Sequence, residues 1–323
     1  MVSEPLLKVE DLYVYYKTYK GVLKVLNGVN LELHRGEKIG VIGESGCGKT
    51  TTMKAILRIL PPNALVPRGK VLFEGKNLYE MKPRELRKIR GRRISMIFQD
   101  PTAALNPVFK VGDQLIDVIR HTRHHSSASR EELKAEALKL LEEVALPDPE
   151  RVFNSYPFQL SGGMRQRICI AMAIGTTKDI LIADEPTTNL DVTIQDQVLR
   201  LIDRLVEKRG ISLILISQAL GIIRSMVSRV YTMYAGEVVE VAETYDTFSK
   251  PLHPYTRGLV SSVPRLTGEG IPEGISGRIP DYLNPPKGCR FSPRCEYAEE
   301  RCHKERPPLI DVGGRKVACW LYA

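Results

Sequence analysis

Residues 43–50 read GESGCGKT, and these eight residues are the strongest indication of the fold. It fits the pattern G-x-x-x-x-G-K-S/T, follows an apolar run at Lys38–Ile42, and opens a segment with helical spacing from Thr50. In such a strand–loop–helix context the glycines let backbone N–H groups approach phosphate, and the helix N-terminus adds a favourable dipole. The sequence therefore predicts a phosphate-binding loop (P-loop), in which Lys49 reaches the β- and γ-phosphates and the Thr50 hydroxyl binds Mg²⁺.

Aliphatic runs of strand length alternate with helical patterns along the chain. Such alternation indicates an α/β fold with a largely parallel core sheet. Residues from about Asp100 to Leu160 lack aliphatic strand runs, and we expect a helical insertion there. The strand-like runs are Leu7–Tyr16, Val29–Leu33, Lys38–Ile42, Val71–Phe73, Ile94–Phe98, Ile180–Ala183, Ile211–Ile216 and Val230–Tyr234. The helical patterns are Arg130–Val144, Met164–Ile174 and Ile194–Lys208.

The composition is that of a globular protein. Of the 323 residues, 43% are hydrophobic and 26% are charged, which argues against disorder or a fibre. No apolar run approaches the roughly 20 residues that span a bilayer, and the amino terminus shows no secretory signal pattern. The formal net charge of +9 suits nucleic acid, anionic lipid or a phosphorylated ligand, and does not decide among them. The six cysteines are expected to be reduced thiols, either buried or bound to metal.

Two carboxylates end the apolar run at Ile180–Ala183. Asp184 suits a contact with Mg²⁺ through water or through the ligands of the ion, and Glu185 is able to polarise an attacking water. A strand that ends in Asp-Glu is common in proteins, but together with the P-loop it predicts nucleotide hydrolysis.

A second anion-binding terminus is predicted at Ser161, Gly162 and Gly163, directly before a helical pattern. One triphosphate does not need two such cradles from one subunit. With these motifs in this order, the chain resembles the nucleotide-binding subunits of ABC transporters over essentially its whole length. In that family the second cradle closes over ATP held by a partner subunit.

The resemblance implies roles for further residues. Gln99 matches the Q-loop, which contacts Mg²⁺ and the transmembrane subunits, and Asn189-Leu190-Asp191 matches the D-loop. An aromatic residue normally stacks on adenine; Tyr16 fits best, with Tyr19 as the alternative. The expected ATP-binding residues are Tyr16, Tyr19, Gly43, Glu44, Ser45, Gly46, Cys47, Gly48, Lys49, Thr50, Thr51, Ser161, Gly162 and Gly163. The expected catalytic residues are Lys49, Gln99, Glu185 and Gln218, and the expected Mg²⁺ ligands are Thr50, Gln99 and Asp184.

One position departs from the family pattern. Where the family carries a switch histidine followed by aspartate, this chain has Gln218 and Ala219. Glutamine is able to donate a hydrogen bond to the γ-phosphate, but it does not carry a positive charge or exchange a proton near neutral pH. We expect slow hydrolysis at the site built on this chain's own P-loop. The alternative, that Gln218 substitutes adequately, stays open.

The carboxy-terminal segment is rich in Pro and Gly and poor in long aliphatic residues, so it is either a flexible tail or a small region held by something else. Cys289, Cys295, Cys302 and Cys319 have the spacing C-x₅-C-x₆-C-x₁₆-C, which suits one Zn²⁺ or a 4Fe-4S cluster. The absence of a tight C-x₂₋₄-C pair favours the cluster, and four unrelated thiols are the alternative. Cys47 and Cys169 are expected to be packing residues. Together with the sequence PLHPYT at 251–256, this segment resembles the carboxy-terminal region of oligopeptide/dipeptide importer ATPases.

The resemblance implies an ABC nucleotide-binding domain over residues 1–245, with an antiparallel β subdomain and a helical subdomain at about 100–165. Residues 246–323 form the small Cys-rich carboxy-terminal region. The basic run at residues 82–93 has no interleaved aromatic residue, so no nucleic-acid partner is expected.

The implied function is to couple ATP hydrolysis to uptake of peptides or related solutes. The implied partners are a second ABC ATPase subunit, two transmembrane permease subunits and an extracellular solute-binding protein. The implied location is the cytoplasmic face of the membrane. Three alternatives stay open: an importer of oligosaccharides or nickel, a soluble ABC ATPase acting on ribosomes or DNA, and a regulatory protein that binds ATP without turnover.

Overall fold

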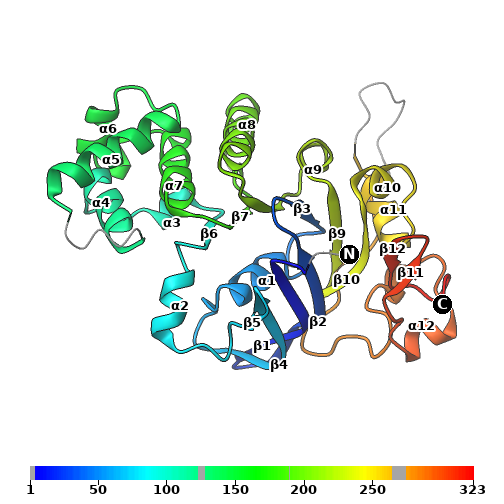
Figure 1. The fold of residues 1–323 in the computed structure, drawn as a ribbon. Helices are drawn as coiled ribbons and strands as arrows, with labels where there is room; N and C mark the ends of the chain where they lie inside the picture. The colour runs from blue at the N-terminus through cyan, green and yellow to red at the C-terminus, as the bar shows by residue number, and fades with distance from the viewer. Residues whose placement is uncertain (1–3, 123–127, 189, 264–273) are drawn as a thin grey trace. The chain divides into compact units, whose positions relative to one another are not determined.

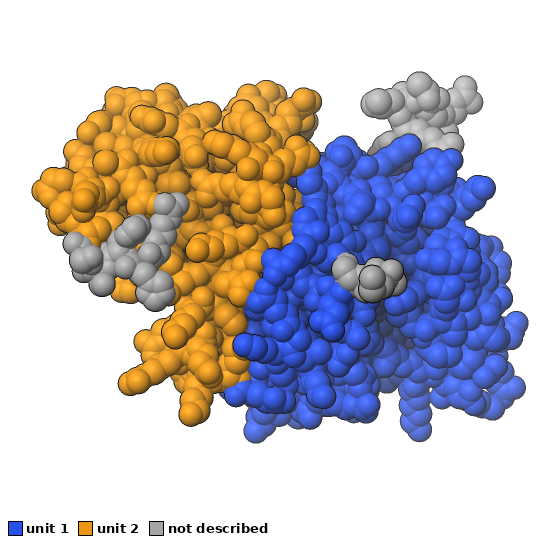
Figure 2. Space-filling view, in the orientation of Figure 1, with its two compact units in different colours: residues 1–80, 215–323 blue, residues 81–214 orange. Residues whose placement is uncertain are grey.

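The computed structural model describes residues 4–122, 128–188, 190–263 and 274–323 (Figure 1). The chain divides into two compact units (Figure 2). The first unit comprises residues 1–80 and 215–323, and the second comprises residues 81–214. The boundary at residues 214 and 215 falls inside a strand, β8 (Ser212–Ile216).

The first unit contains a four-stranded antiparallel sheet in the order β2-β1-β4-β5. Alternate residues of its first strand, including Leu7 and Val9, are buried, as expected for a strand that covers the core with one face. The first two strands form a hairpin in which Thr18 pairs with Gly21. The strands are β1 (Leu7–Thr18), β2 (Gly21–Leu33), β4 (Ala64–Phe73) and β5 (Lys76–Asn77).

A second group of strands in the first unit has the order β11-β12-β10-β9-β3. β3 and β9 are parallel, with Ile42 opposite Thr232, whereas the pairs β9–β10, β10–β12 and β12–β11 are antiparallel. Ile39, Val41 and Ile42 of β3 are fully buried, which agrees with a continuous apolar strand at the centre of a sheet. The strands are β3 (Lys38–Ile42), β9 (Arg229–Tyr234), β10 (Glu237–Glu243), β11 (Ile310–Val312) and β12 (Arg315–Val317).

An aromatic cluster holds the described part of the carboxy-terminal region. The ring of Tyr234, at the end of β9, lies 4.6 Å from Tyr255 and 5.0 Å from Phe291, centroid to centroid. Each such pair contributes roughly 0.5–1.5 kcal/mol beyond its buried area. The helices of the first unit are α1 (Lys49–Ile56), α9 (Leu220–Met226), α10 (Thr244–Ser249), α11 (Pro254–Ser261), the 3-10 turn η2 (Ser292–Arg294) and α12 (Glu300–Lys304). The sequence left open whether the carboxy-terminal segment is a flexible tail or is held by another element. The aromatic cluster shows that its described part is held by β9.

The second unit has the strand order β8-β7-β6, and β6 and β7 pair in parallel with Ile97 opposite Ala183. Between them, the described residues of the segment 100–160 form helices and loops, as predicted for the helical insertion. The strands are β6 (Ile94–Ile97) and β7 (Ile180–Asp184). The helices are α2 (Pro83–Ile89), α3 (Pro101–Ala104), α4 (Val111–Thr122), α5 (Arg130–Glu143), α6 (Pro149–Asn154), the 3-10 turn η1 (Pro157–Gln159), α7 (Gly162–Thr176) and α8 (Val192–Arg209).

Mixed sheets and helices of this kind are the α/β fold that the sequence predicts. Across the residues that the structure describes, every helix is either too short or too polar to cross a membrane.

Candidate nucleotide site

The P-loop connects β3 to α1, and two of its three glycines are required by the space around them. Gly43 has φ +147°, and a Cβ there would lie 2.2 Å from the Met233 carbonyl oxygen. Gly48 has φ +104°, and a Cβ there would lie 2.7 Å from the Leu26 side chain. Both positions combine a left-handed backbone with close packing, so only glycine fits without displacing a neighbour. The local sequence thus builds the tight loop that the pattern predicts.

Lys49 begins α1 and folds back over the loop. Its side chain is 4% exposed, and Nζ donates to the carbonyl oxygens of Gly43 at 2.8 Å and Glu44 at 2.9 Å. Thr50, the next residue, is half-buried. The ammonium group is therefore held inside the loop, where it is placed to meet an anion bound by the loop's backbone.

The two candidate adenine-stacking tyrosines differ in their surroundings. The Tyr16 hydroxyl lies 3.4 Å from Thr51 Oγ1 on α1, whereas Tyr19 is 94% exposed at the hairpin turn. This contact places Tyr16 beside the P-loop helix. Stacking of either ring on adenine stays a prediction.

The end of β7 presents the two predicted carboxylates. Asp184 is 2% exposed, and Glu185, which follows it, is half-buried with φ +46°. A non-glycine residue in the left-handed region costs of the order of 1–3 kcal/mol and persists where the surroundings fix it. Gln99 Nε2 donates to Glu185 Oε2 at 3.0 Å, and Thr188 Oγ1 donates to the same oxygen at 3.1 Å. Two donors thus orient a carboxylate of the kind that acts as a general base.

Thr188 is a residue that the sequence reasoning missed. It lies three positions after Glu185 in a turn, where a short hydroxyl side chain reaches back to the preceding carboxylate. A threonine three positions after the carboxylate is the sequence feature that predicts this contact.

Ser161 and the following glycines begin α7. Ser161 Oγ accepts a hydrogen bond from the Met164 N–H at 3.3 Å, which is the usual role of an N-cap serine. Gln166, on the same helix, is 1% exposed, and its Nε2 donates to the Pro186 carbonyl oxygen at 2.6 Å. Gln166 therefore ties the start of α7 to the turn that carries Glu185, and it is a second residue absent from the predicted set.

Asp191 caps α8, because its carboxylate accepts from the Ile194 N–H at 3.0 Å. Asn189, which was predicted with it as part of the D-loop, lies outside the described residues. Gln218 follows β8 and is exposed, like Ala219 after it. The predicted residues fall in two groups: the P-loop, Tyr16, Tyr19 and Gln218 belong to the first unit, and Gln99, Ser161, Gly162, Gly163, Asp184, Glu185 and Asp191 to the second.

The four carboxy-terminal cysteines line one small cavity, together with residues that include Phe291 and Trp320. The cavity has a volume of about 20 Å³. The Cys289 N–H donates to the Cys302 carbonyl oxygen at 2.8 Å, and burial raises the pKa of the Cys289 thiol to about 12. Within the described ranges, however, no three His, Cys, Asp or Glu side chains are arranged to hold a metal ion. The predicted iron–sulfur or zinc site at Cys289, Cys295, Cys302 and Cys319 is therefore not supported by the structure.

The other two thiols are buried, as expected of packing residues. Cys47 in the P-loop is 0% exposed and Cys169 on α7 is 8% exposed. Burial raises the pKa of Cys169 to about 12 and also raises that of Cys47, so both are protonated at neutral pH.

Comparison with known proteins identifies the class. Residues 26–188 match the ABC transporter family, and residues 239–302 match the oligopeptide/dipeptide transporter C-terminal region. One solved structure that matches this chain is the dimeric post-hydrolysis state of an ATP-binding cassette bound to ADP and Pi. Its chain is 27% identical to this one, and the two superpose with a TM-score of 0.65. That match covers 74% of this chain and 98% of the other.

Two relatives match this chain over almost its whole length and indicate the family within the ABC transporters. The dipeptide transport ATP-binding protein DppD of Bacillus subtilis is 45% identical over 322 residues, which cover 98% of this chain and 95% of that protein. The oligopeptide transport ATP-binding protein OppD of Haemophilus influenzae is 42% identical, and the alignment covers 99% of this chain and 98% of that protein. The chain belongs to the ABC transporter ATPases, in the oligopeptide/dipeptide family of ATP-binding subunits. The predicted fold class, family and ATP hydrolase activity are thereby confirmed, and the activity implies ATP and Mg²⁺ as ligands.

Proposed function

We propose that this chain is the ATP-binding subunit of an importer that takes up peptides. The observation that carries the proposal is the presence of both matched regions in one chain, the ATPase at 26–188 and the oligopeptide/dipeptide carboxy-terminal region at 239–302. Relatives described as dipeptide and oligopeptide transport proteins support it along the full length.

In the proposed mechanism the P-loop N–H groups and Lys49 bind the β- and γ-phosphates. Glu185, oriented by Gln99 and Thr188, polarises the water that attacks the γ-phosphate in line. The Thr50 hydroxyl, the Asp184 carboxylate and the Gln99 amide are the oxygen donors proposed to hold Mg²⁺, which prefers such ligands. Bound there, the ion would neutralise charge on the phosphate oxygens. Positioning and charge stabilisation supply most of the rate enhancement in such a reaction.

The proposed assembly is a head-to-tail pair of ATPase subunits. The Ser161 terminus supports this, because it offers a second anion cradle that one nucleotide does not need from its own subunit. We propose a second, different ABC ATPase as the partner, two transmembrane permease subunits, a solute-binding protein, and peripheral attachment to the permease at the membrane. Gln218 in place of the switch histidine supports two unequal sites, with the slower one on this chain's P-loop.

The proposed function is tested by uptake in the strain that encodes the chain. Lys49→Ala is expected to abolish uptake of labelled di- and oligopeptides, because the P-loop loses its phosphate-binding charge. Lys54→Gln on the same helix is the matched control and should leave uptake intact. Peptide uptake that persists in Lys49→Ala, with loss of oligosaccharide or nickel uptake instead, would assign the alternative cargo.

A further inference from the structure

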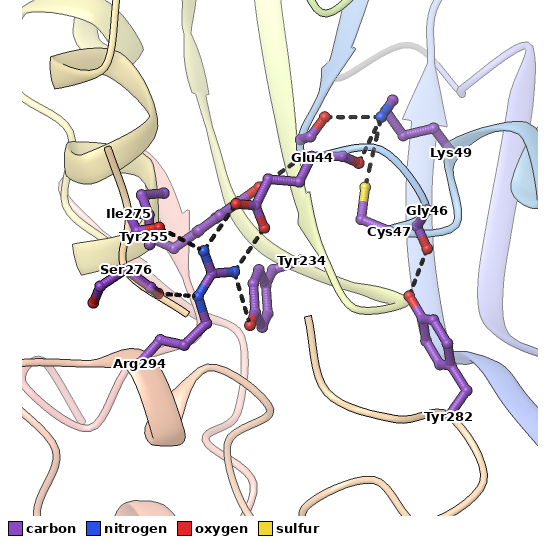
Figure 3. A network of polar contacts seen from close by, with 11 residues as sticks. Glu44, Gly46, Cys47, Lys49, Tyr234, Tyr255, Ile275, Ser276, Tyr282 and Arg294 are labelled. Atoms are coloured by element: carbon purple, nitrogen blue, oxygen red, sulfur yellow. Dashed lines mark hydrogen bonds and ion pairs between the residues drawn. The ribbon is translucent and has the colours of Figure 1, made fainter. Parts of the chain in front are cut away.

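Three side chains from the carboxy-terminal region bind the P-loop directly (Figure 3). The Tyr255 hydroxyl accepts from the Glu44 N–H at 2.8 Å, and the Tyr282 hydroxyl donates to the Gly46 carbonyl oxygen at 2.7 Å. Arg294 donates to both carboxylate oxygens of Glu44, from Nη1 at 2.7 Å and from Nη2 at 2.9 Å. The loop is thus tethered at both its backbone and a side chain.

Arg294 is held in one orientation by its other contacts. Its side chain is 4% exposed, and Nε donates to the Ser276 carbonyl oxygen at 2.7 Å. Nη2 also donates to the Ile275 carbonyl oxygen at 3.1 Å, and Nη1 to the Tyr234 hydroxyl at 3.3 Å. A buried, bidentate arginine of this kind fixes geometry, unlike an exposed ion pair, which contributes little.

The same short segment forms a wall of the cysteine cavity. Arg294 ends η2 and is followed directly by Cys295, and Phe291 and Ser292 also line that cavity. Phe291 packs against Tyr255, with ring centroids 5.4 Å apart. The residues that tether the loop and those that surround the thiols therefore belong to one packed cluster.

We propose that the carboxy-terminal region is a positioning element of the nucleotide site, with Arg294 as the central positioning residue. Acting through Glu44, Arg294 holds the Gly-rich loop in the shape that receives the phosphates. A loop with several glycines loses much conformational entropy when it closes on a ligand, and prior ordering removes part of that cost from binding. This inference rests on the proposed assignment of residues 43–50 to the phosphates of ATP.

The test compares two partly buried arginines of the same region. Arg294→Met removes the tether, and Arg257→Met is the matched control. Arg257 donates to the Pro251 carbonyl oxygen and the Tyr322 hydroxyl, and neither belongs to the P-loop. The Kd of a fluorescent ATP analogue with Mg²⁺ is measured on the full chain, together with Tm, and KM and kcat are measured in the assembled transporter.

Arg294→Met is expected to raise Kd and KM for ATP by about tenfold, in the lower part of the range of roughly 5–150-fold for coupling between linked sites. Arg294→Lys keeps the charge and should recover part of the loss. Arg257→Met should lower Tm with Kd unchanged. If Arg294→Met, like Arg257→Met, lowers Tm and leaves Kd unchanged, the proposal is overturned. The contact would then only stabilise the fold.

A double-mutant cycle tests whether Arg294 acts through Glu44. Glu44→Gln combined with Arg294→Met should be no worse than either single variant, because both remove the same interaction; additive losses would overturn the proposed route. Lys49→Ala distinguishes an error in the phosphate site from an error in the positioning role of Arg294. Unchanged affinity in Lys49→Ala would refute the phosphate site itself, whereas lost affinity there with normal affinity in Arg294→Met would overturn only the positioning role.

Discussion

The Gln99 amide donates to the Glu185 carboxylate at 3.0 Å, although the two residues are 86 positions apart in the sequence. The parallel pairing of β6 and β7 explains the contact. Ile97 lies opposite Ala183, so the residues two positions further along each strand leave the same edge of the sheet side by side. A polar pair at the carboxyl ends of parallel strands is where α/β proteins commonly place their functional groups.

Replacement of the oriented carboxylate should separate binding from chemistry. Glu185→Gln keeps the side chain's shape and its polar contacts but removes the basic group. We expect kcat for ATP to fall by about 10²–10⁴-fold with little change in the Kd for ATP. Steady-state turnover and nucleotide binding on the same preparation check this. Turnover within a few-fold of wild type would mean that another group activates the water.

The hydroxyl of Thr188 should contribute through the orientation of Glu185. Thr188→Val preserves the volume and removes the donor to Glu185 Oε2. Because a hydrogen bond to a charged group is worth about 1.5–3 kcal/mol, we expect kcat to fall by roughly ten- to a hundredfold, with KM unchanged. Thr187→Val, at the neighbouring position, is the control. A rise in KM with constant kcat would assign Thr188 to binding instead.

Gln218→His introduces the side chain that the resemblance to ABC ATPases leads us to expect at this position. If the glutamine slows the site on this chain's P-loop, the variant should raise ATP turnover of the assembled complex. The comparison needs wild-type and variant complexes at matched composition across a pH series, because the imidazole exchanges protons near neutral pH. Unchanged turnover at every pH would show that glutamine performs the same function.

The Glu143–Arg209 pair in the second unit predicts a pH dependence of stability. Burial raises the pKa of Glu143, but the charges of Arg209 and Lys208 outweigh it, so the folded pKa lies below 4.5. The stabilisation is present above pH 4.5, the unfolded value, and is lost as the pH falls through the lower folded value.

Chemical denaturation of Glu143→Gln measures that contribution. At pH 7 the variant should lose about 1 kcal/mol of unfolding free energy, and the difference from wild type should shrink below pH 4.5. Asp196→Asn, which removes the partner of the exposed Arg200, serves as the control and should show no measurable change. A constant difference at all pH values would contradict the assignment.

The features of this protein that depend on residues close together in the chain could be predicted from its sequence. The P-loop is readable because its glycines, its lysine and the flanking strand and helix lie within one short stretch. The buried strands Lys38–Ile42 and Ile180–Asp184 were predicted to within a residue, because a central strand must be apolar on both faces. The hairpin of β11 and β12 was missed because its strands are only three residues long, although Gly313 and Gly314, with φ +62° and +81°, mark its turn.

The contacts between side chains that are distant in the sequence could not be predicted and depend on the folded structure. Arg294 and Glu44 are 250 positions apart, and no periodicity or spacing links them. Thr188 and Gln99 reach Glu185 because of strand register and a left-handed turn, both of which depend on the packed sheet. The carboxy-terminal segment lacks a core of its own in the sequence, and it is ordered by aromatic residues of β9 and α11 that become its neighbours only after folding.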